Sequence, residues 1–304
     1  MYQPVQKTDS LLQAVAEHSD TVASIHSSGG GEGFSFDHLL HHVHDSHEIE
    51  IPGGVVNLPH LHSFQIGGLT IDPSPTKHSF FLVLSALLLI ILAVRTARQY
   101  RKTLIPRGLT SLMEIVVLFI RDEIVLPNMG EEGIRYTPYL LTTFFFILIM
   151  NVIGMIPYGA TATGNIMVTA GLALIAFFII QISALRSQGL KHYLLHLTGG
   201  VHWGLWIIMI PTEIIGLFTK PFALCVRLFA NMNAGHIVIL SLIGLIFLFQ
   251  SYAIAPVSVL MALFINLLEL LVAVLQAYIF TMLTSLFIGF GLQPSHEAEH
   301  DEHA

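Results

Sequence analysis

The last third of the chain is almost free of formal charge. From residue 221 to residue 296, Arg227 and Glu269 are the only side chains that carry a full charge at neutral pH. The apolar stretches around them are longer than the roughly 20 residues that cross a bilayer, and a backbone in lipid must satisfy its own hydrogen bonds. We therefore expect two long, tilted transmembrane helices, 207–249 and 254–290, that form an antiparallel hairpin.

The composition extends this expectation to the rest of the chain. Of its 304 residues, 54% are hydrophobic and 11% are charged. Soluble domains carry about 25% charged residues, so an ordinary soluble protein is excluded. Three further apolar stretches lie at 78–95, 139–157 and 165–185, and a break that contains Pro, Gly and Thr separates the last two. The predicted fold class is an all-α polytopic membrane protein with about five transmembrane helices.

The charge is distributed unevenly. Residues 1–78 have a net charge of −7, the C-terminal tail is also acidic, and the part between them is mildly basic. Because no basic side chains cluster as a binding surface, nucleic-acid binding is excluded. Five basic residues follow the first span and mark the cytoplasmic side by the positive-inside rule: Arg95, Arg98, Arg101, Lys102 and Arg107.

This charge pattern divides the chain into three regions. We expect a polar, His-rich extracytoplasmic region (1–77), a membrane domain (78–292) and an acidic cytoplasmic tail (293–304). Residues 109–126 mix aliphatic and charged side chains, which is typical of an amphipathic helix at the cytoplasmic interface. Residues 48–69 alternate at period two and predict a small β-hairpin element outside the membrane.

The histidines between residues 38 and 47 have two interpretations. They could ligate a transition metal through their imidazoles. The segment contains no cysteine and shows no fixed ligand spacing, so we interpret it as a solvated, pH-sensitive outer segment.

Arg227 and Glu269 are the first candidate functional residues, because a formal charge at membrane depth costs at least about 2.5–3.5 kcal/mol. The alternative is a structural ion pair, or an arginine that extends to the lipid headgroups. If the two long helices turn back near Tyr252, His236 lies level with Glu269, and Arg227 lies level with Gln276. A purely structural role does not predict that the rare polar groups pair in this way.

The helical phase separates two kinds of site. Arg227 and His236 are nine residues apart, so at about 100° per residue they face opposite sides of their helix, roughly 13.5 Å apart along its axis. Asn231 extends the face of Arg227, while Glu269 and Gln276 share one stripe of the last helix. The pattern indicates a proton path, with a permanent cation at mid-depth and a titratable His–Glu site displaced toward the outside.

The residue types suit the movement of protons. Arginine stays protonated at any accessible pH, so it can oppose a carboxylate without becoming a proton carrier. An opposite charge within about 4–6 Å favours the ionised form of a carboxyl group. Histidine and glutamate have reference pKa values near 6.5 and 4.3, so both can exchange protons with outside water.

Two segments of the last two helices carry a family resemblance. Residues 220–236 read KPFALCVRLFANMNAGH and residues 275–280 read LQAYIF. Together they resemble the two central motifs of subunit a of the F-type ATP synthase, bacterial type. Asn151 and residues 163–166 resemble the middle hairpin of the same family, and the resemblance covers roughly residues 75–292.

The resemblance implies a function. Subunit a is the stator of the Fo sector, against which a ring of c subunits rotates. It supplies two offset half-channels and so couples transmembrane proton flow to c-ring rotation and ATP synthesis. Arg227 matches the family's essential arginine, which faces the ring carboxylates and deprotonates them. Further residues match positions associated with proton translocation: His236, Glu269, Gln276, Asn231 and Glu213.

One pair departs from a common bacterial pattern of the family. That pattern has an acid at position 236 and a histidine at position 269, whereas the two are exchanged here, as in mitochondrial relatives. Because the two positions are expected to lie level, the exchange can preserve the function of the pair. Glu213 has a second interpretation, since it could simply pair with Lys220 near the interface.

The resemblance also implies partners and a location. The expected partners are the c-subunit ring, the b subunits of the peripheral stalk, the remainder of the FoF1 complex and the lipid bilayer. The expected location is the bacterial inner membrane, with the N-terminus extracytoplasmic and the C-terminus cytoplasmic. Neither a cofactor nor a metal is expected, and the isolated chain is not expected to be catalytic.

The sequence argues against two other classes of protein. A secondary transporter often has an internal inverted repeat, and none is visible here. An intramembrane metalloenzyme that uses His236 and Glu269 would need a third ligand at comparable depth, which the sequence does not offer. A stator is expected to be inert alone and to need a c ring, whereas a transporter or an enzyme would act by itself.

Overall fold

The structure is a computed structural model that describes residues 48–51, 54–57, 64–66, 69–71, 74–102, 108–156, 159, 161–197, 206–249 and 254–292. The histidines between residues 38 and 47 and the acidic tail (293–304) lie outside the described residues, so the expectations for them stay predictions.

Within the described residues, five helices are long and apolar enough to cross a membrane. This confirms the expectation of an all-α polytopic membrane protein. The five helices are α3 (Lys77–Lys102), α6 (Thr137–Gly154), α7 (Ile166–Leu197), α8 (Trp206–Phe249) and α9 (Ala255–Leu292).

The polar breaks of the sequence explain several helix boundaries. Pro138 occupies the first turn of α6, where its missing N–H needs no partner. Asn165 precedes α7, and its side-chain oxygen accepts a hydrogen bond from the N–H of Met167 at 2.8 Å, as an N-cap does. Within α7 the helical backbone is interrupted at Gly189, whose φ of 75° favours glycine.

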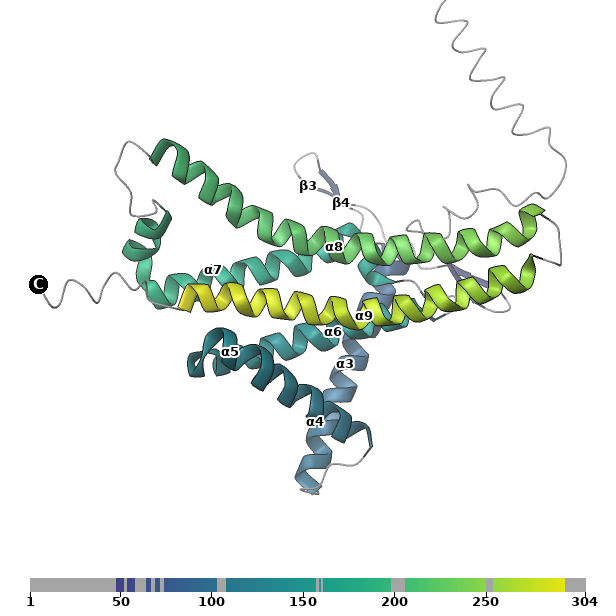
Figure 1. Ribbon diagram of the computed structural model, residues 1–304, viewed down its shortest axis with the longest axis horizontal. Helices are drawn as coiled ribbons and strands as arrows, with labels where there is room; N and C mark the ends of the chain where they lie inside the picture. The colour runs from purple at the N-terminus through teal and green to yellow at the C-terminus, as the bar shows by residue number, and fades with distance from the viewer. Residues whose placement is uncertain are drawn as a thin grey trace, which may run out of the picture.

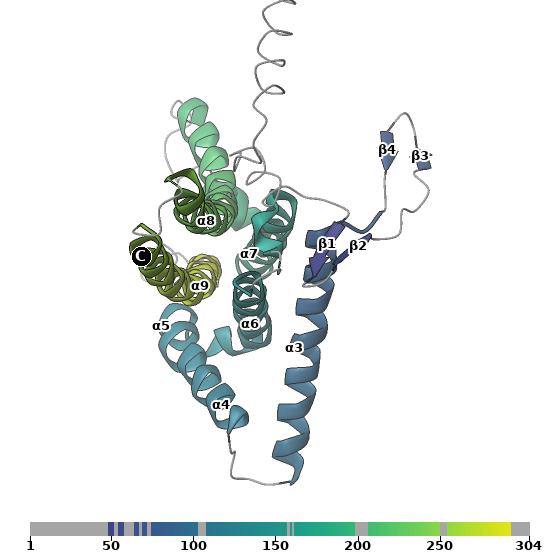
Figure 2. The ribbon, with the colours of Figure 1, turned by 90° about the vertical axis from the view of Figure 1, so that its right-hand side faces the viewer.

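The last two helices form the long antiparallel hairpin that the apolar stretches predicted. Helix α8 has 44 residues and α9 has 38 residues, and they lie side by side along much of their length in Figure 1. Both are far longer than the about 20 residues that span a bilayer upright. In Figure 2 α3 is seen lengthwise whereas α6, α7, α8 and α9 are seen nearly end on, so α3 crosses the other four steeply.

The expected amphipathic helix at 109–126 is helical but not regular. It consists of α4 (Leu109–Phe119), a π-helical segment (Ile120–Val125) and α5 (Leu126–Met129), followed by a 3-10 segment (Glu131–Tyr136). The π-helical segment shifts the helix phase, so Ile120, Ile124 and Val125 are buried while Arg121 and Asp122 remain exposed.

The alternating segment near the N-terminus forms two small antiparallel hairpins rather than one. β1 (Glu48–Ile51) pairs with β2 (Gly54–Asn57), and β3 (Phe64–Ile66) pairs with β4 (Leu69–Ile71). Both precede α3, and Figure 2 shows β1 and β2 beside the N-terminal end of that helix, with β3 and β4 farther away from it.

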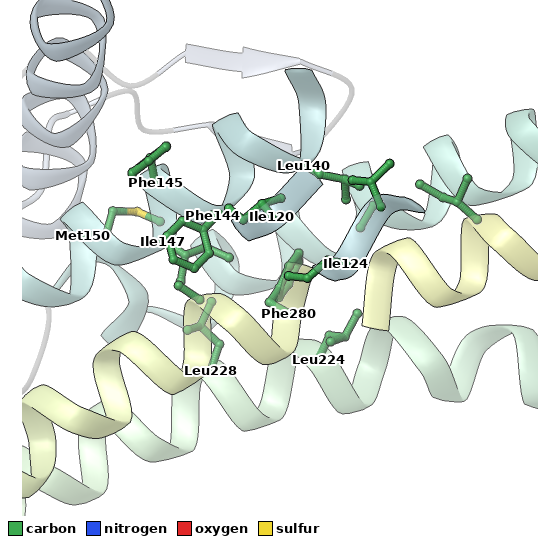
Figure 3. Packing of buried hydrophobic residues seen from close by; sticks show 14 of the residues in the cluster. Ile120, Ile124, Leu140, Phe144, Phe145, Ile147, Met150, Leu224, Leu228 and Phe280 are labelled. Atoms are coloured by element: carbon green, nitrogen blue, oxygen red, sulfur yellow. The ribbon is translucent and has the colours of Figure 1, made fainter. Parts of the chain in front are cut away.

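The hydrophobic core lies where α6, α8 and α9 meet the π-helical segment (Figure 3). Phe144 and Ile147 of α6 lie in one buried cluster with Leu228 of α8 and Phe280 of α9. Helix α9 also approaches α5 closely, since a Cβ at Gly289 would lie 2.1 Å from the carbonyl oxygen of Asn128. This packing holds α9 in place along the half of the helix that follows Glu269.

Candidate functional site

His236 of α8 and Glu269 of α9 lie against each other in the hairpin. His236 Nδ1 is 3.6 Å from Glu269 Oε1, so the side chains that were expected to lie level do meet. The Glu269 side chain is 4% exposed and the His236 side chain is 27% exposed. A buried carboxyl beside a partly accessible imidazole can pass a proton between the interior and the surroundings.

Gly235 makes this close approach possible. A Cβ at position 235 would lie 2.7 Å from Glu269 Oε1 and 2.8 Å from its Cδ, so the carboxyl rests directly on the backbone of α8. Oε1 accepts no hydrogen bond from the described residues. The carboxyl is therefore held by packing and by the facing imidazole, and it keeps a lone pair free to accept a proton. This glycine was not among the residues predicted from the sequence.

Two residues that were not predicted as part of the site complete the surroundings of His236. Thr161 Oγ1 lies 2.6 Å from His236 Nε2, the ring nitrogen on the side away from Glu269. The backbone carbonyl of Thr161 in turn accepts a hydrogen bond from Nδ1 of His78, at 2.9 Å. Helix α3, the loop before α7, helix α8 and helix α9 thus contribute to one connected polar cluster.

Further hydrogen bonds hold the short turn between α6 and α7. Thr161 lies directly before the 3-10 segment (Ala162–Gly164) of this turn. Thr163 Oγ1 donates to Asn151 Oδ1 at 2.8 Å, and Asn233 Nδ2 donates to the Gly164 carbonyl at 3.0 Å. Asn151 is fully buried on α6 and also reaches the backbone of α9. This segment was identified in the sequence only as a break between two spans and as part of the family resemblance.

Arg227 lies on an exposed face of α8. The ion pairs among the described residues are Arg121–Asp122, Arg135–Glu132 and His236–Glu269, so Arg227 has no acidic partner there. A cation in an apolar span is costly without a counter-charge. The arrangement leaves Arg227 able to pair with a carboxylate that comes from outside the described chain.

Asn231 and Gln276 form a second contact between polar side chains of the two helices. Asn231 Nδ2 donates to Gln276 Oε1 at 3.1 Å, and Gln276 is buried. We expected Arg227 to lie level with Gln276, but the side chain in contact with Gln276 is Asn231, one helical turn after Arg227. Asn231 and Arg227 are both exposed on α8, and Asn231 is the one that hydrogen-bonds to α9.

Glu213 and Lys220 do not pair within the described residues. Lys220 Nζ lies instead 4.8 Å from the centre of the Phe287 ring on α9. Glu213 lies close enough to Tyr193 to act on it, since burial and, secondarily, the charge of Glu213 raise the pKa of Tyr193 above its ordinary value. The pairing alternative for Glu213 is therefore wrong here, and Glu213 stands apart from the His236 cluster.

The described residues contain no group of three or more His, Cys, Asp or Glu side chains that could hold a metal ion. The His236–Glu269 and Asn231–Gln276 contacts between α8 and α9 have different characters. One pairs two groups that can exchange a proton, and the other pairs two amides that cannot. Arg227 also belongs to α8, where its side chain lies on an exposed face of the helix.

These features define a polytopic helical membrane protein with a cation on an exposed face of α8 and a His–Glu pair between α8 and α9. A family model described as ATP synthase A chain matches residues 79–289. The chain therefore belongs to the ATP synthase A chain family, which confirms the resemblance based on the segments around Arg227 and Gln276.

Curated relatives support the same assignment over nearly the whole chain. An ATP synthase subunit a of Chloroherpeton thalassium is 53% identical over 267 residues, which cover 86% of this chain and 78% of that protein. One of Chlorobium phaeobacteroides (strain BS1) is 50% identical, over 94% of this chain and 86% of its own. One of Anaeromyxobacter dehalogenans is 48% identical, over 96% of this chain and 78% of its own.

Proposed function

We propose that this chain is the proton-conducting stator subunit of the Fo sector of an ATP synthase. In this proposal it couples proton flow across the membrane to rotation of a c-subunit ring and thereby to ATP synthesis. The observation that carries the proposal is Arg227, an exposed cation in the apolar helix α8 with no acidic partner among the described residues. Such a cation requires a carboxylate from a neighbouring subunit, and the family membership supports the c ring as its source.

Arg227 acts by changing the ionisation of the passing carboxylates. A guanidinium within about 4–6 Å stabilises the ionised form of a carboxyl group, so a ring carboxyl that arrives protonated releases its proton there into the adjoining half-channel. Arginine never takes that proton itself, because it stays charged at any accessible pH. It therefore separates two half-channels without carrying protons between them.

His236 and Glu269 supply the access route from the outer side. They lie roughly 13.5 Å along the α8 axis from Arg227, by the rise of an α-helix over nine residues. The 3.6 Å contact between Nδ1 and Oε1 supports direct exchange of a proton within the pair. Asn231 and Gln276, hydrogen-bonded to each other, line the route between this pair and the arginine. Glu213 belongs to the cytoplasmic route.

The proposal includes partners and an orientation. The chain contacts the c ring through the Arg227 face of α8, and it associates with the b subunits of the peripheral stalk and the rest of the FoF1 complex. It lies in the bacterial inner membrane with its N-terminus outside and its C-terminus in the cytoplasm. The chain alone is not catalytic, since proton transfer to a ring carboxylate needs the ring.

ATP-driven proton pumping in inverted vesicles that carry the whole complex tests the role of Arg227. The variant is Arg227→Ala, and the matched control is Arg121→Ala, which removes an exposed arginine already paired with Asp122. We expect Arg227→Ala to abolish pumping while the complex still assembles, and the control to pump normally. Passive proton leak after removal of the catalytic head is expected to change only in Arg227→Ala.

Normal coupled pumping by Arg227→Ala would overturn the proposal. A second measurement separates the stator from a self-contained transporter. The purified chain in liposomes without a c ring is expected to move no protons under an imposed pH gradient. Rapid, saturable proton movement by the chain alone would favour the transporter.

A further inference from the structure

Thr161 contacts His236 from the side opposite Glu269. We propose that Thr161 is a positioning residue of the proton-translocation site, whose hydroxyl keeps Nδ1 of His236 turned toward Glu269 while leaving either ring nitrogen free to carry the proton. The inference rests on the proposed function, because it assigns Thr161 a part in the outer proton route.

The hydroxyl suits this role because it can both donate and accept a hydrogen bond. When His236 carries its proton on Nδ1, the hydroxyl donates to Nε2 across the 2.6 Å contact. When the proton is on Nε2, that nitrogen donates to the hydroxyl oxygen, and the lone pair of Nδ1 faces Glu269. The ring therefore keeps one orientation when the doubly protonated imidazolium gives its Nδ1 proton to the Glu269 carboxylate, because the remaining Nε2–H still donates to the hydroxyl. The freed lone pair of Nδ1 can then take a proton back.

His78 shows what a different partner would do. Its Nδ1 faces the carbonyl oxygen of Thr161, and a carbonyl can only accept a hydrogen bond. The proton of His78 is therefore held on Nδ1, and this imidazole is fixed in one tautomer. A carbonyl at the position of the Thr161 hydroxyl would hold a proton on Nε2 of His236 and would exclude the tautomer that is protonated on Nδ1 alone.

Thr161 is itself held firmly, as a positioning residue must be. It is 3% exposed, and its carbonyl is bound by the buried His78. A Cβ at Gly154 would lie 1.9 Å from Thr161 Oγ1 and 2.7 Å from its Cα, so the turn packs directly on the end of α6. The lack of a side chain at Gly154 therefore leaves the room that the Thr161 hydroxyl occupies beside His236.

The charged and titratable groups around His236 come from two other helices. Glu269 faces it from α9, and Lys77 and His78 act on it electrostatically from α3. Thr161 is the uncharged member of this group. Its removal leaves the charges in place and changes only the orientation of the ring, which a pH profile can separate from a general loss of stability.

The test compares three variants in the whole complex, in inverted vesicles whose lumen is the outer side. Thr161→Val removes the hydroxyl at nearly constant volume, and Thr161→Ser restores it. Thr169→Val is the matched control, because Thr169 is also buried near the start of α7 but its hydroxyl bonds to its own helix and Cys225. ATP synthesis driven by a pH jump is measured over a range of lumenal pH and normalised to assembled complex.

We expect Thr161→Val to lose roughly fivefold in rate, the factor that corresponds to one ordinary hydrogen bond, and to shift the lumenal pH profile. Thr161→Ser is expected to recover the rate and the profile, and Thr169→Val to match the unaltered complex. An unchanged rate and profile in Thr161→Val would overturn the inference. So would a serine variant as impaired as the valine variant.

Arg227→Ala in the same vesicles tests the proposed function separately from the positioning role of Thr161. If Arg227→Ala blocks ATP synthesis while Thr161→Val is silent, the positioning role is wrong and the proposed function stands. If Arg227→Ala synthesises ATP normally, the proposed function fails, and the role of Thr161 fails with it.

Discussion

Gly235 offers the most direct test of the geometry between α8 and α9. In Gly235→Ala the added Cβ would lie 2.7 Å from Glu269 Oε1, where ordinary contacts begin at 3.4 Å. The carboxyl therefore has to move by about 0.7 Å or more, while alanine favours the helix by about 1 kcal/mol over glycine. We expect the variant protein to fold and assemble, with Glu269 displaced from its place beside His236.

A displacement of about 1 Å in a reacting group can lower a rate by up to roughly a hundredfold. We therefore expect Gly235→Ala to reduce ATP-driven proton pumping by about tenfold to a hundredfold at equal amounts of assembled complex. Gly171→Ala is the matched control, since Gly171 lies in α7 with no neighbouring atom within 4 Å of its Cβ position. Equal pumping by the two variants would refute the reasoning that Gly235 sets the position of the carboxyl.

Two further predictions concern the packing that supports the site. Gly289→Ala places a Cβ 2.1 Å from the carbonyl oxygen of Asn128, and this backbone atom cannot rotate out of the way as a side chain can. We therefore expect the variant to lose about 1–3 kcal/mol of stability, measured as a lower thermal midpoint of the purified complex. A midpoint equal to that of Gly171→Ala would contradict this. Asn151→Leu removes the buried amide that holds the turn before α7, and we expect a similar loss, about 1–3 kcal/mol, measured in the same way. An Asn151→Leu complex as stable as the unaltered one would show that the turn is held by other contacts.

The contact between His236 and Glu269 could be predicted because few polar groups occur in these spans. Two long apolar stretches joined by a short break must run antiparallel, and the position of the break then decides which residues lie level. The same reasoning paired Arg227 with Gln276, yet Asn231 makes that contact. The predicted depth of Gln276 along α8 was right to within about one helical turn. The direction of the side chains decided that Asn231, and not Arg227, contacts Gln276.

The residues that surround His236 could not be predicted in this way. Thr161 is separated from His236 by 75 positions and His78 from Thr161 by 83 positions, so no local period connects them. A threonine in a loop and a histidine at the start of a span are common, and nothing in their neighbourhood marks them. The irregular helix between Leu109 and Met129 was not predicted either. Its π-helical segment contacts α9, where Ser285 Oγ donates to the Ile124 carbonyl, and no local pattern marks that contact.

The sequence by itself determined that this chain is a helical membrane protein and which residues in its last two helices are exceptional. The reason is that lipid forbids an unsatisfied backbone and makes each formal charge costly, so apolar length and rare charge can be read residue by residue. Only the tertiary structure decided that Arg227 faces outward, that Gly235 admits the Glu269 carboxyl, and that Thr161 holds the ring of His236. Those contacts depend on how separate helices rotate and slide against one another, and close packing of side chains settles that only when the whole chain is folded.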